Sequence, residues 1–519
     1  MKTKAVRLHG AGDLRLDEFE LPEITDDEIL AEVIADSLCM STYKCASLGA
    51  AHKRVHDDVA DHPAIMGHEF AGNIVKVGKN HQDKFKPGMK FTLQPALNYK
   101  GTMWSPGYSY ESFGGDTEYT VVPAEVISDS LCMSTYKCAS LGAAHKRVHD
   151  DVADHPAIMG HEFAGNIVKV GKNHQDKFKP GMKFTLQPAL NYKGTMWSPG
   201  YSYEFFGGDT QYTIIPSEVM ELGCLLEYTG EAYYDAALAE PMSCNIGAFH
   251  ANYHTQMGVY THEMGIKKDG KVCMLAGGGP MGLAGITYAL NGDLRPGLLV
   301  MGDIDEARLE RARRLFPKEE YAEKGIQVEF VNTGKMADPV AELKALSGGT
   351  GYDDVFVYAP IASVAELGTA VLGRDGCLNM FAGATDPNFS ANINYYDIHY
   401  NSTHYIGTTG GNTADMIESL ELTAAGRINP AVMVTHIGGL DSCAKATMEQ
   451  PKLGGGKKLI YTHKKFPLTC IDDFEKLGKS DDALAPHWAK LHEIVSKTSM
   501  LWNLEAENYL LANFPGIDD

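Results

Sequence analysis

An internal repeat dominates this chain: residues 31–123 recur almost unchanged as residues 124–216, so each position of the first copy has a counterpart 93 positions later. A period of this length is too long for a solenoid, and two modules that merely pack together need not be nearly identical. Tandem duplication is the better explanation, and removing one copy would leave 426 of the 519 residues, the size of a two-domain enzyme. Only five pairs differ: Ala35/Ser128, Ser112/Phe205, Glu118/Gln211, Val121/Ile214 and Val122/Ile215.

Composition and charge narrow the function classes. The chain is 44% hydrophobic and 22% charged, and no apolar run reaches the length of a membrane span. With 46 basic and 67 acidic residues the formal charge is −21, which argues against binding to nucleic acid or a membrane surface. The ten cysteines show no CxxC spacing, which favours a reduced compartment. The N-terminus lacks the apolar stretch of a secretory signal, so we expect a cytoplasmic location.

Two patterns divide the chain. Residues 1 to about 240 are rich in Gly, Pro and short alternating runs, which predicts many strands and turns. From about residue 270 short apolar runs alternate with helical stretches, which predicts a parallel, doubly wound sheet. Near the C-terminus, residues 487–497 and 504–514 have helical periodicity, and we expect their Trp and Leu side chains to lie in a core. The four apolar runs of the predicted parallel sheet are residues 272–276, 298–301, 328–331 and 355–358.

A glycine-rich motif follows the first of these apolar runs and precedes a predicted helix. Gly277, Gly279 and Gly282 have the spacing that permits a tight turn, close approach of a pyrophosphate, and close packing of helix on strand. Asp303 ends the next predicted strand, 21 residues past Gly282, where a carboxylate accepts the ribose hydroxyls of NAD and repels a 2′-phosphate. The motif therefore indicates NAD binding. Arg308 lies nearby, which leaves NADP as the less favoured cofactor.

A second group of residues has the chemistry of a catalytic metal site. Cys39, His68, Glu69 and Glu240 offer a thiolate, an imidazole and carboxylates, a mixed set suited to a Zn²⁺ ion that keeps one position open. Each residue alone would be interpreted as structural. Their order ahead of a dinucleotide-binding motif favours the zinc interpretation.

Together, these motifs resemble the zinc-dependent medium-chain alcohol and polyol dehydrogenases. The resemblance implies a GroES-like β-rich catalytic domain, here partly duplicated, and a Rossmann cofactor domain, with a small-molecule substrate and a homo-oligomeric assembly. A narrower set of motifs is similar to the branch that reduces L-sorbose 1-phosphate to glucitol 6-phosphate. The general motifs are residues 39–41, 67–72, 238–241 and 277–282, and the narrower ones are residues 36–41, 106–110, 410–416 and 454–459.

The resemblance also implies roles for single residues. It places four residues around one catalytic zinc, with Glu69 either bound to the metal or just behind it, and gives three of them equivalents in the second copy. A serine two residues past the cysteine would bond the substrate oxygen and pass its proton. The zinc residues are Cys39, His68, Glu69 and Glu240, with Cys132, His161 and Glu162 in the second copy; the serines are Ser41 and Ser134.

Two features depart from the family pattern. Many relatives carry a histidine five residues after the zinc cysteine, where it hands a proton to solvent, but this chain has Lys44 and Lys137. Such a lysine either offers a cation to a phosphorylated sugar or is a solvated surface residue. No cysteine lies between Cys45 and Cys132, so the four-cysteine structural zinc loop is absent and one zinc per completed site is expected.

Two further clusters of basic residues invite a phosphate-binding interpretation. Lys457 and Lys458 follow three glycines, but this segment is better interpreted as the start of a strand. Residues 52–54, a His-Lys-Arg run, are either a phosphate contact or part of a solvated loop.

The expected domains are residues 1–123 (catalytic domain with the first copy), 124–241 (second copy and remainder of the catalytic domain), 242–410 (NAD-binding domain) and 411–519 (return to the catalytic domain and terminal helices). Because Glu240 and the nucleotide motif occur once, a single chain completes one site. We favour the second copy, which keeps its covalent link to Glu240. The alternatives are a dehydrogenase of an unphosphorylated polyol or secondary alcohol, and an inactive NAD-binding product of the duplication.

Overall fold

The computed structural model describes residues 2–24, 29–38, 45–51, 55, 59–66, 70–77, 90–92, 119–122, 128–130, 163–167, 177–179, 181–187, 190, 215, 219, 222–256, 258–384, 386–450 and 452–517. The chain forms two compact units, residues 1–240 with 434–519, and residues 241–433. The boundaries expected from the sequence lie between residues 241 and 242 and between residues 410 and 411. No helix among the described residues is long and apolar enough to cross a membrane.

The first unit contains a three-stranded sheet in the order β2-β1-β4 and an 11-stranded sheet. The path of the larger sheet is β11-β10-β9-β6-β5-β3-β21-β20-β22, with β7 paired to β3 and β8 paired to β9. The strands are β1 Lys2–Gly10, β2 Asp13–Glu20, β3 Ile29–Leu38, β4 Ala64–Ile65, β5 Phe70–Val77, β6 Lys90–Thr92, β7 Tyr119–Val122, β8 Ser128–Ser130, β9 Phe163–Asn166, β10 Lys183–Leu186, β11 Leu225–Tyr228, β20 Val434–Gly439, β21 Lys457–Tyr461 and β22 Thr469–Cys470.

Both copies of the repeat contribute strands to this one sheet. In the first copy, residues 71–73 of β5 pair with residues 90–92 of β6. Their counterparts, residues 164–166 of β9 and 183–185 of β10, pair in the same register. Strand β6 also pairs with β9, which places Lys90 opposite Asn166, the copy of its partner in β5. Identical sequence thus yields an identical hairpin twice, and the second hairpin extends the sheet of the first.

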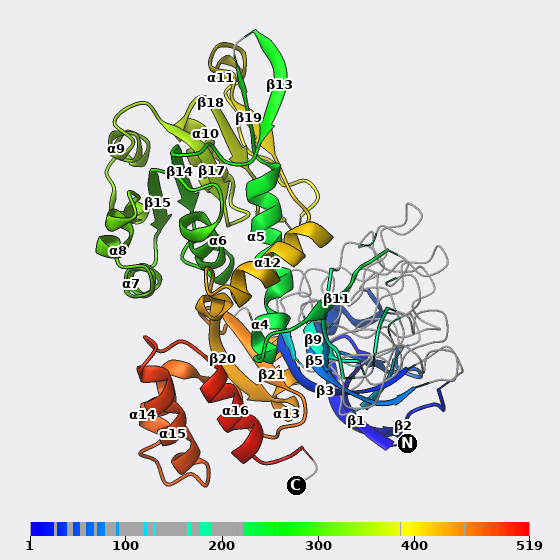
Figure 1. The fold of residues 1–519 in the computed structure, drawn as a ribbon. Coiled ribbons are helices and arrows are strands. Elements are labelled where there is room, and N and C mark those ends of the chain that lie inside the picture. The colour runs from blue at the N-terminus through cyan, green and yellow to red at the C-terminus, as the bar shows by residue number, and fades with distance from the viewer. Residues whose placement is uncertain are drawn as a thin grey trace. The chain divides into compact units, whose positions relative to one another are not determined.

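The C-terminal segment adds helices to the first unit. Trp488 and Trp502 are 2% and 1% exposed, and Leu491 and Leu510 are fully buried, so their apolar faces form a core as predicted. Figure 1 shows α14, α15 and α16 near the C-terminus, in orange to red. Among the described residues, this unit includes helices α4 Tyr233–Ala237, α13 Leu440–Glu449, α14 Phe474–Leu477, α15 Ala485–Ser496 and α16 Leu504–Asn513, with 3-10 turns at Gly49–Ala51 and Ile471–Asp473.

The second unit is built on a six-stranded parallel sheet in the order β16-β15-β14-β17-β18-β19. Helices alternate with its strands along the chain (Figure 1). Its elements are α5 Ala239–Ala251, which starts just before the unit boundary, β12 Tyr253–Gln256, β13 Val259–Met264, β14 Lys271–Leu275, α6 Pro280–Asn291, β15 Leu298–Asp303, α7 Glu306–Leu315, α8 Lys318–Glu323, β16 Gln327–Asn332, α9 Pro339–Leu346, β17 Tyr352–Val357, α10 Ala362–Val371, β18 Leu372–Asn379, α11 Tyr395–Asn401, β19 His404–Ile406 and α12 Thr413–Ala424, with 3-10 turns at Thr333–Lys335 and Pro430–Met433.

The four apolar runs found in the sequence are β14, β15, β16 and β17, so the predicted doubly wound fold is confirmed. Their side chains form one buried core that includes Cys273, Val300, Val355 and Val357. The β12–β13 hairpin was not predicted. All six residues of β13 are exposed, so the strand lacks the apolar alternation by which a half-buried strand is recognised.

Candidate active site

The glycine turn joins strand β14 to helix α6. A Cβ atom on Gly282 would overlap the carbonyl oxygen of Gly277, so the first turn of the helix packs directly on the end of the strand. A Cβ on Gly277 would lie 2.8 Å from Cγ of Met301 in the neighbouring strand β15. Side chains at either position would separate the helix from the sheet. These two glycines are therefore required by the fold itself.

Gly279 has a different environment. It is the N-cap residue of α6, with Pro280 in the first turn of the helix, and a Cβ atom built on it would meet nothing within 4 Å. The turn therefore leaves open space beside the N-terminus of α6, where backbone N–H groups and the helix dipole favour an anion. This arrangement fits the pyrophosphate of a dinucleotide.

Asp303 lies at the end of β15 and is only 4% exposed. Its Oδ2 accepts a hydrogen bond from the N–H of Gly278 at 2.9 Å. Its Oδ1 accepts hydrogen bonds from the N–H groups of Ile304 at 2.8 Å and Asp305 at 3.0 Å. A carboxylate has about four lone-pair directions, so three N–H donors fix its orientation and leave capacity for a further donor such as a ribose hydroxyl. The Asp303 charge disfavours a 2′-phosphate at this position.

Arg308 stands in the first turn of α7, next to this carboxylate. Its Nε lies 3.7 Å from Oδ2 of Asp305, and the side chain is 42% exposed. Asp305 is also the N-cap of α7, since it accepts hydrogen bonds from Ala307 and Arg308. The guanidinium therefore forms an exposed ion pair with Asp305.

Glu240 is the described member of the predicted zinc set. It is 4% exposed and lies three residues beyond the end of helix α4, in the first turn of α5. Two residues of the second repeat copy reach α4 by hydrogen bonds: Nδ2 of Asn166 donates to the Tyr233 hydroxyl at 3.3 Å, and Oγ1 of Thr185 donates to the carbonyl of Ala236 at 3.0 Å. A buried carboxylate so placed is chemically suited to a metal ion.

The other predicted catalytic and metal residues lie outside the described part of the chain. No group of three or more His, Cys, Asp or Glu that could hold a metal occurs among the residues that the structure describes. The basic run at residues 52–54 is also outside them. The residues not described are Cys39, Ser41, Lys44, His68 and Glu69, and Cys132, Ser134, Lys137, His161 and Glu162.

Lys457 and Lys458 do lie in the described part. Both are 2% exposed and begin strand β21, and Nζ of Lys458 donates to the carbonyl of Gly456 at 2.6 Å. They support the structural interpretation of this segment rather than a phosphate site.

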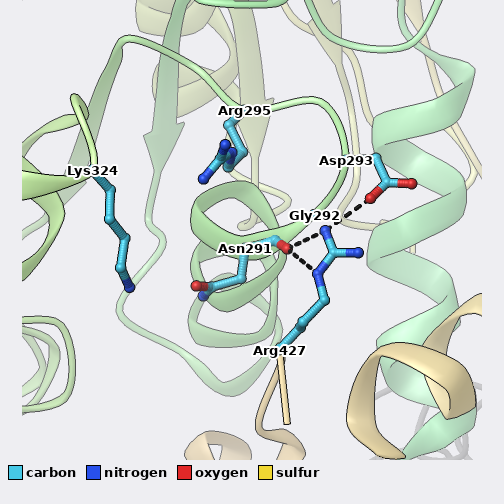
Figure 2. Close-up of a pocket in the computed structure, with 6 residues that line it drawn as sticks. All are labelled: Asn291, Gly292, Asp293, Arg295, Lys324 and Arg427. Atoms are coloured by element: carbon cyan, nitrogen blue, oxygen red, sulfur yellow. Dashed lines mark hydrogen bonds and ion pairs between the residues drawn. The ribbon is translucent and has the colours of Figure 1, made fainter. Parts of the chain in front are cut away.

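Figure 2 shows a surface pocket of about 340 Å³ at the C-terminal end of α6, the opposite end from the glycine turn. Arg427 donates from Nη2 to the carbonyl of Asn291 at 2.7 Å and to Oδ1 of Asp293 at 2.8 Å. A guanidinium at this place satisfies a terminal helix carbonyl. The pocket lies at the opposite end of α6 from Gly279, where Arg427 caps the helix C-terminus. It is therefore not the dinucleotide site.

One contributor to the candidate site was missed from the sequence. Glu507, in the C-terminal helix α16, accepts hydrogen bonds from the backbone of Tyr233 and Tyr234, in the helix that leads to Glu240. The two segments are 274 and 273 residues apart in the chain. No local pattern signals such a long-range contact.

Comparison with known proteins places these features in a family. The alcohol dehydrogenase GroES-like domain matches twice, at residues 25–130 and 126–229. A protein of Aliivibrio fischeri named mannitol-1-phosphate 5-dehydrogenase is 52% identical over 385 residues, which cover 74% of this chain and 90% of the relative. The chain belongs to the zinc-dependent medium-chain alcohol and polyol dehydrogenases.

Other members of this dehydrogenase family agree. The L-sorbose 1-phosphate reductase of Klebsiella pneumoniae is 45% identical over 390 residues, covering 75% of this chain and 91% of the relative. The crystal structure of 2R,3R-butanediol dehydrogenase from Bacillus subtilis superposes with a TM-score of 0.57 at 18% identity, covering 89% of this chain and 99% of that one. The comparison with the butanediol dehydrogenase structure concerns the fold alone, and it confirms the GroES-like and Rossmann architecture.

Proposed function

We propose that this protein is an NAD(H)-dependent polyol-phosphate dehydrogenase that interconverts L-sorbose 1-phosphate and glucitol 6-phosphate. The supporting observation is the sequence similarity to two relatives whose names include a sugar phosphate or a polyol phosphate. The matched region covers about nine-tenths of each relative. The narrower motifs at residues 410–416 and 454–459 resemble the same branch of the family. An unphosphorylated polyol is the competing substrate.

Each proposed residue has a role in holding the reactants. Asp303 would accept the ribose hydroxyls, and the space beside Gly279 would take the pyrophosphate. Ser41 or Ser134 would bond the substrate oxygen and deliver its proton, while Lys44 or Lys137 would pair with the substrate phosphate. Bound Zn²⁺ would supply Lewis-acid polarisation of the substrate carbonyl, and NADH would supply the hydride.

We propose that one zinc binds per chain, held by Glu240 together with the second-copy set Cys132, His161 and Glu162. The hydrogen bonds from Asn166 and Thr185 to helix α4 support this choice, since they tie the second copy to the segment that carries Glu240. The first-copy set is the alternative. We also expect a homo-oligomer, and the exposed strand β13, whose Tyr260 is 98% exposed, offers surface for association.

Zinc content and turnover on one sample of the full-length chain test the proposal. We expect about one zinc per chain by elemental analysis, NADH-dependent reduction of L-sorbose 1-phosphate, and a much lower kcat/KM for oxidation of sorbitol than of glucitol 6-phosphate. Preference for sorbitol would replace the phosphorylated substrate by the free polyol. Protein that binds NADH but holds no zinc and turns over neither substrate would be the inactive product of the duplication.

A further inference from the structure

Helix α4 is held at its start by a distant carboxylate. The N-cap position of α4 is Ala232, which has no side chain able to accept the first backbone N–H groups. Glu507 of helix α16 accepts them instead: its Oε2 bonds the N–H of Tyr233 at 2.6 Å and its Oε1 bonds the N–H of Tyr234 at 3.0 Å. Buried N–H groups left without an acceptor are strongly unfavourable, so this contact fixes the segment.

The carboxylate is itself held in place. Glu507 is fully buried, and Oε1 also accepts a hydrogen bond from the Tyr461 hydroxyl at 2.9 Å. That hydroxyl in turn accepts from Nε1 of Trp502 at 2.7 Å. Trp502 and Tyr461 are almost completely buried, so neither partner can rotate away freely. The chain of bonds runs from Trp502 through Tyr461 and Glu507 to the backbone of α4.

The held segment leads directly to the predicted metal ligand. Helix α4 is only five residues long, and its last N–H bond runs from Leu238 to the carbonyl of Tyr234 at 2.9 Å. Glu240 follows two residues later and is buried. Because few residues separate Tyr233 and Tyr234 from Glu240, a displacement of these two tyrosines should also displace Glu240.

We propose that Glu507 is a positioning residue for the metal site: it fixes residues 233–240 so that the Glu240 carboxylate is preorganised for Zn²⁺. This role rests on the proposed function, in which Glu240 binds the metal. Partners behind a metal ligand tune affinity without touching the ion, and their loss commonly weakens it by about 10–100-fold. The C-terminal helices, which bury their own core, thereby gain a part in the active site.

The test uses full-length zinc protein and the variant Glu507→Gln, which keeps the size of the side chain but turns one acceptor into an N–H₂ donor facing the backbone N–H groups. We expect zinc to leave the variant at least about 10-fold faster when a chelator is added. The visible absorption bands of the cobalt-substituted variant should shift, because the geometry of a ligand has changed. NADH binding should be unaltered, since Asp303 and the glycine turn belong to the other unit.

Asn503→Ala is the matched control. Asn503 is the N-cap of the same helix α16, accepting from the N–H of Ala506 at 3.0 Å, so its loss destabilises the helix without removing the Glu507 carboxylate. We expect a lower Tm and unchanged zinc release. Equal zinc release from both variants would reduce Glu507 to a stabilising residue and overturn the proposal.

A second variant covers the case in which Glu507→Gln does not fold. Tyr461→Phe removes the hydroxyl that donates to Glu507 and keeps the ring, so a smaller acceleration of zinc release is expected. Wild-type release kinetics in both folded variants would refute the role of Glu507. Absence of zinc from the wild-type protein would refute the proposed metal site itself, and the role of Glu507 with it.

Discussion

At the scale of single residues, the three glycines of the motif have separable tasks. Gly277 and Gly282 are needed because the helix lies on the strand, whereas Gly279 faces open space. A Cβ at residue 279 thus has room in the free protein and would compete only with a bound dinucleotide. The same one-carbon change should therefore give opposite results at two positions three residues apart.

We predict that Gly279→Ala leaves the Tm within a few degrees of wild type but weakens NADH binding at least about 10-fold, whereas Gly282→Ala lowers stability by roughly 1–3 kcal/mol through overpacking. Fluorescence titration with NADH and thermal unfolding measure the two effects. Gly454→Ala, at another glycine with open space around it, is the control for the substitution itself. Unchanged NADH affinity in Gly279→Ala would exclude this turn as the pyrophosphate site.

Asp303 should determine both affinity and cofactor choice. We predict that Asp303→Asn weakens NADH binding by about 10-fold or more, because a hydrogen bond to a charged group contributes roughly 1.5–3 kcal/mol. NADPH binding should weaken less, so the ratio of the Kd of NADPH to the Kd of NADH should fall. Asp305→Asn is the control for NADH, since Asn caps a helix as well as Asp does and the Kd of NADH should not change; the Kd of NADPH should fall, because Arg308 is released from its ion pair with Asp305. An equal loss of affinity for NADH and NADPH in Asp303→Asn would contradict the role of Asp303 in selecting NADH.

At the scale of elements, the start of α12 shows what the motif at residues 410–416 does. Asn412 and Asp415 form a capping box, each side chain accepting from the backbone of the other. A Cβ on Gly411 would overlap the carbonyl of Ser243 in α5, and one on Gly247 would lie 2.8 Å from Oδ2 of Asp415. The motif therefore brings α12 into close contact with α5, and its role in this unit is structural.

The same contact carries a titratable pair. Asp415 is 2.7 Å from Nδ1 of His250 in α5, and this hydrogen bond raises the pKa of His250 above its usual value, assisted by the charges of Glu418 and Asp293. A raised histidine pKa stabilises the folded state below the unfolded value near 6.5, and the benefit disappears as pH rises through the folded pKa. Because the His250 side chain is 44% exposed, the contribution should stay below about 1 kcal/mol.

We predict that the denaturation midpoint of the cofactor unit falls as pH rises above about 6.5, and that His250→Gln reduces this fall, with its largest loss at low pH. Urea titrations followed at pH 6 and pH 9 measure the difference. His399→Gln, at an exposed position on α11, should keep the wild-type pH dependence. An equal fall in the denaturation midpoint of His250→Gln at both pH values would mean that the pair stabilises the unit by packing rather than by charge.

Much of the element structure follows from local sequence. Four of the six parallel strands, β14 to β17, contain apolar runs, and the terminal helices repeat Trp and Leu at helical spacing, so pattern alone located these elements; β18 and β19 were not predicted. Strand β13 is exposed throughout, and Glu507 contacts α4 across more than 270 residues, so neither had a signal in the sequence. The metal residues were proposed from their mixed ligand chemistry and their order ahead of the dinucleotide motif, and the family resemblance added their roles; of them the structure describes Glu240.

At the scale of the whole molecule, both copies of the repeat are accommodated because their strands pair within one sheet. A displaced copy would expose unpaired strand edges, but β9 and β10 each have a strand on both sides. The reason lies in the register: β9 presents to β6 the same residues that β5 presents, so Lys90 faces an asparagine on either side. The copy of a strand is complementary to that strand's partner, so β6 pairs with β5 on one edge and with β9 on the other, and the second hairpin extends the sheet.

This accommodation predicts the behaviour of single-copy proteins. Deleting residues 31–123 or residues 124–216 yields two 426-residue chains that differ from each other at only five positions, so each is the control for the other. Both should fold, because one hairpin of the same register remains in either product. We predict equal zinc content and equal kcat/KM for the two deletions, at least matching the full-length chain per zinc bound. An active full-length protein alongside two inactive deletions would mean that residues from both copies build one site, and would exclude the second copy as the sole source of the zinc ligands.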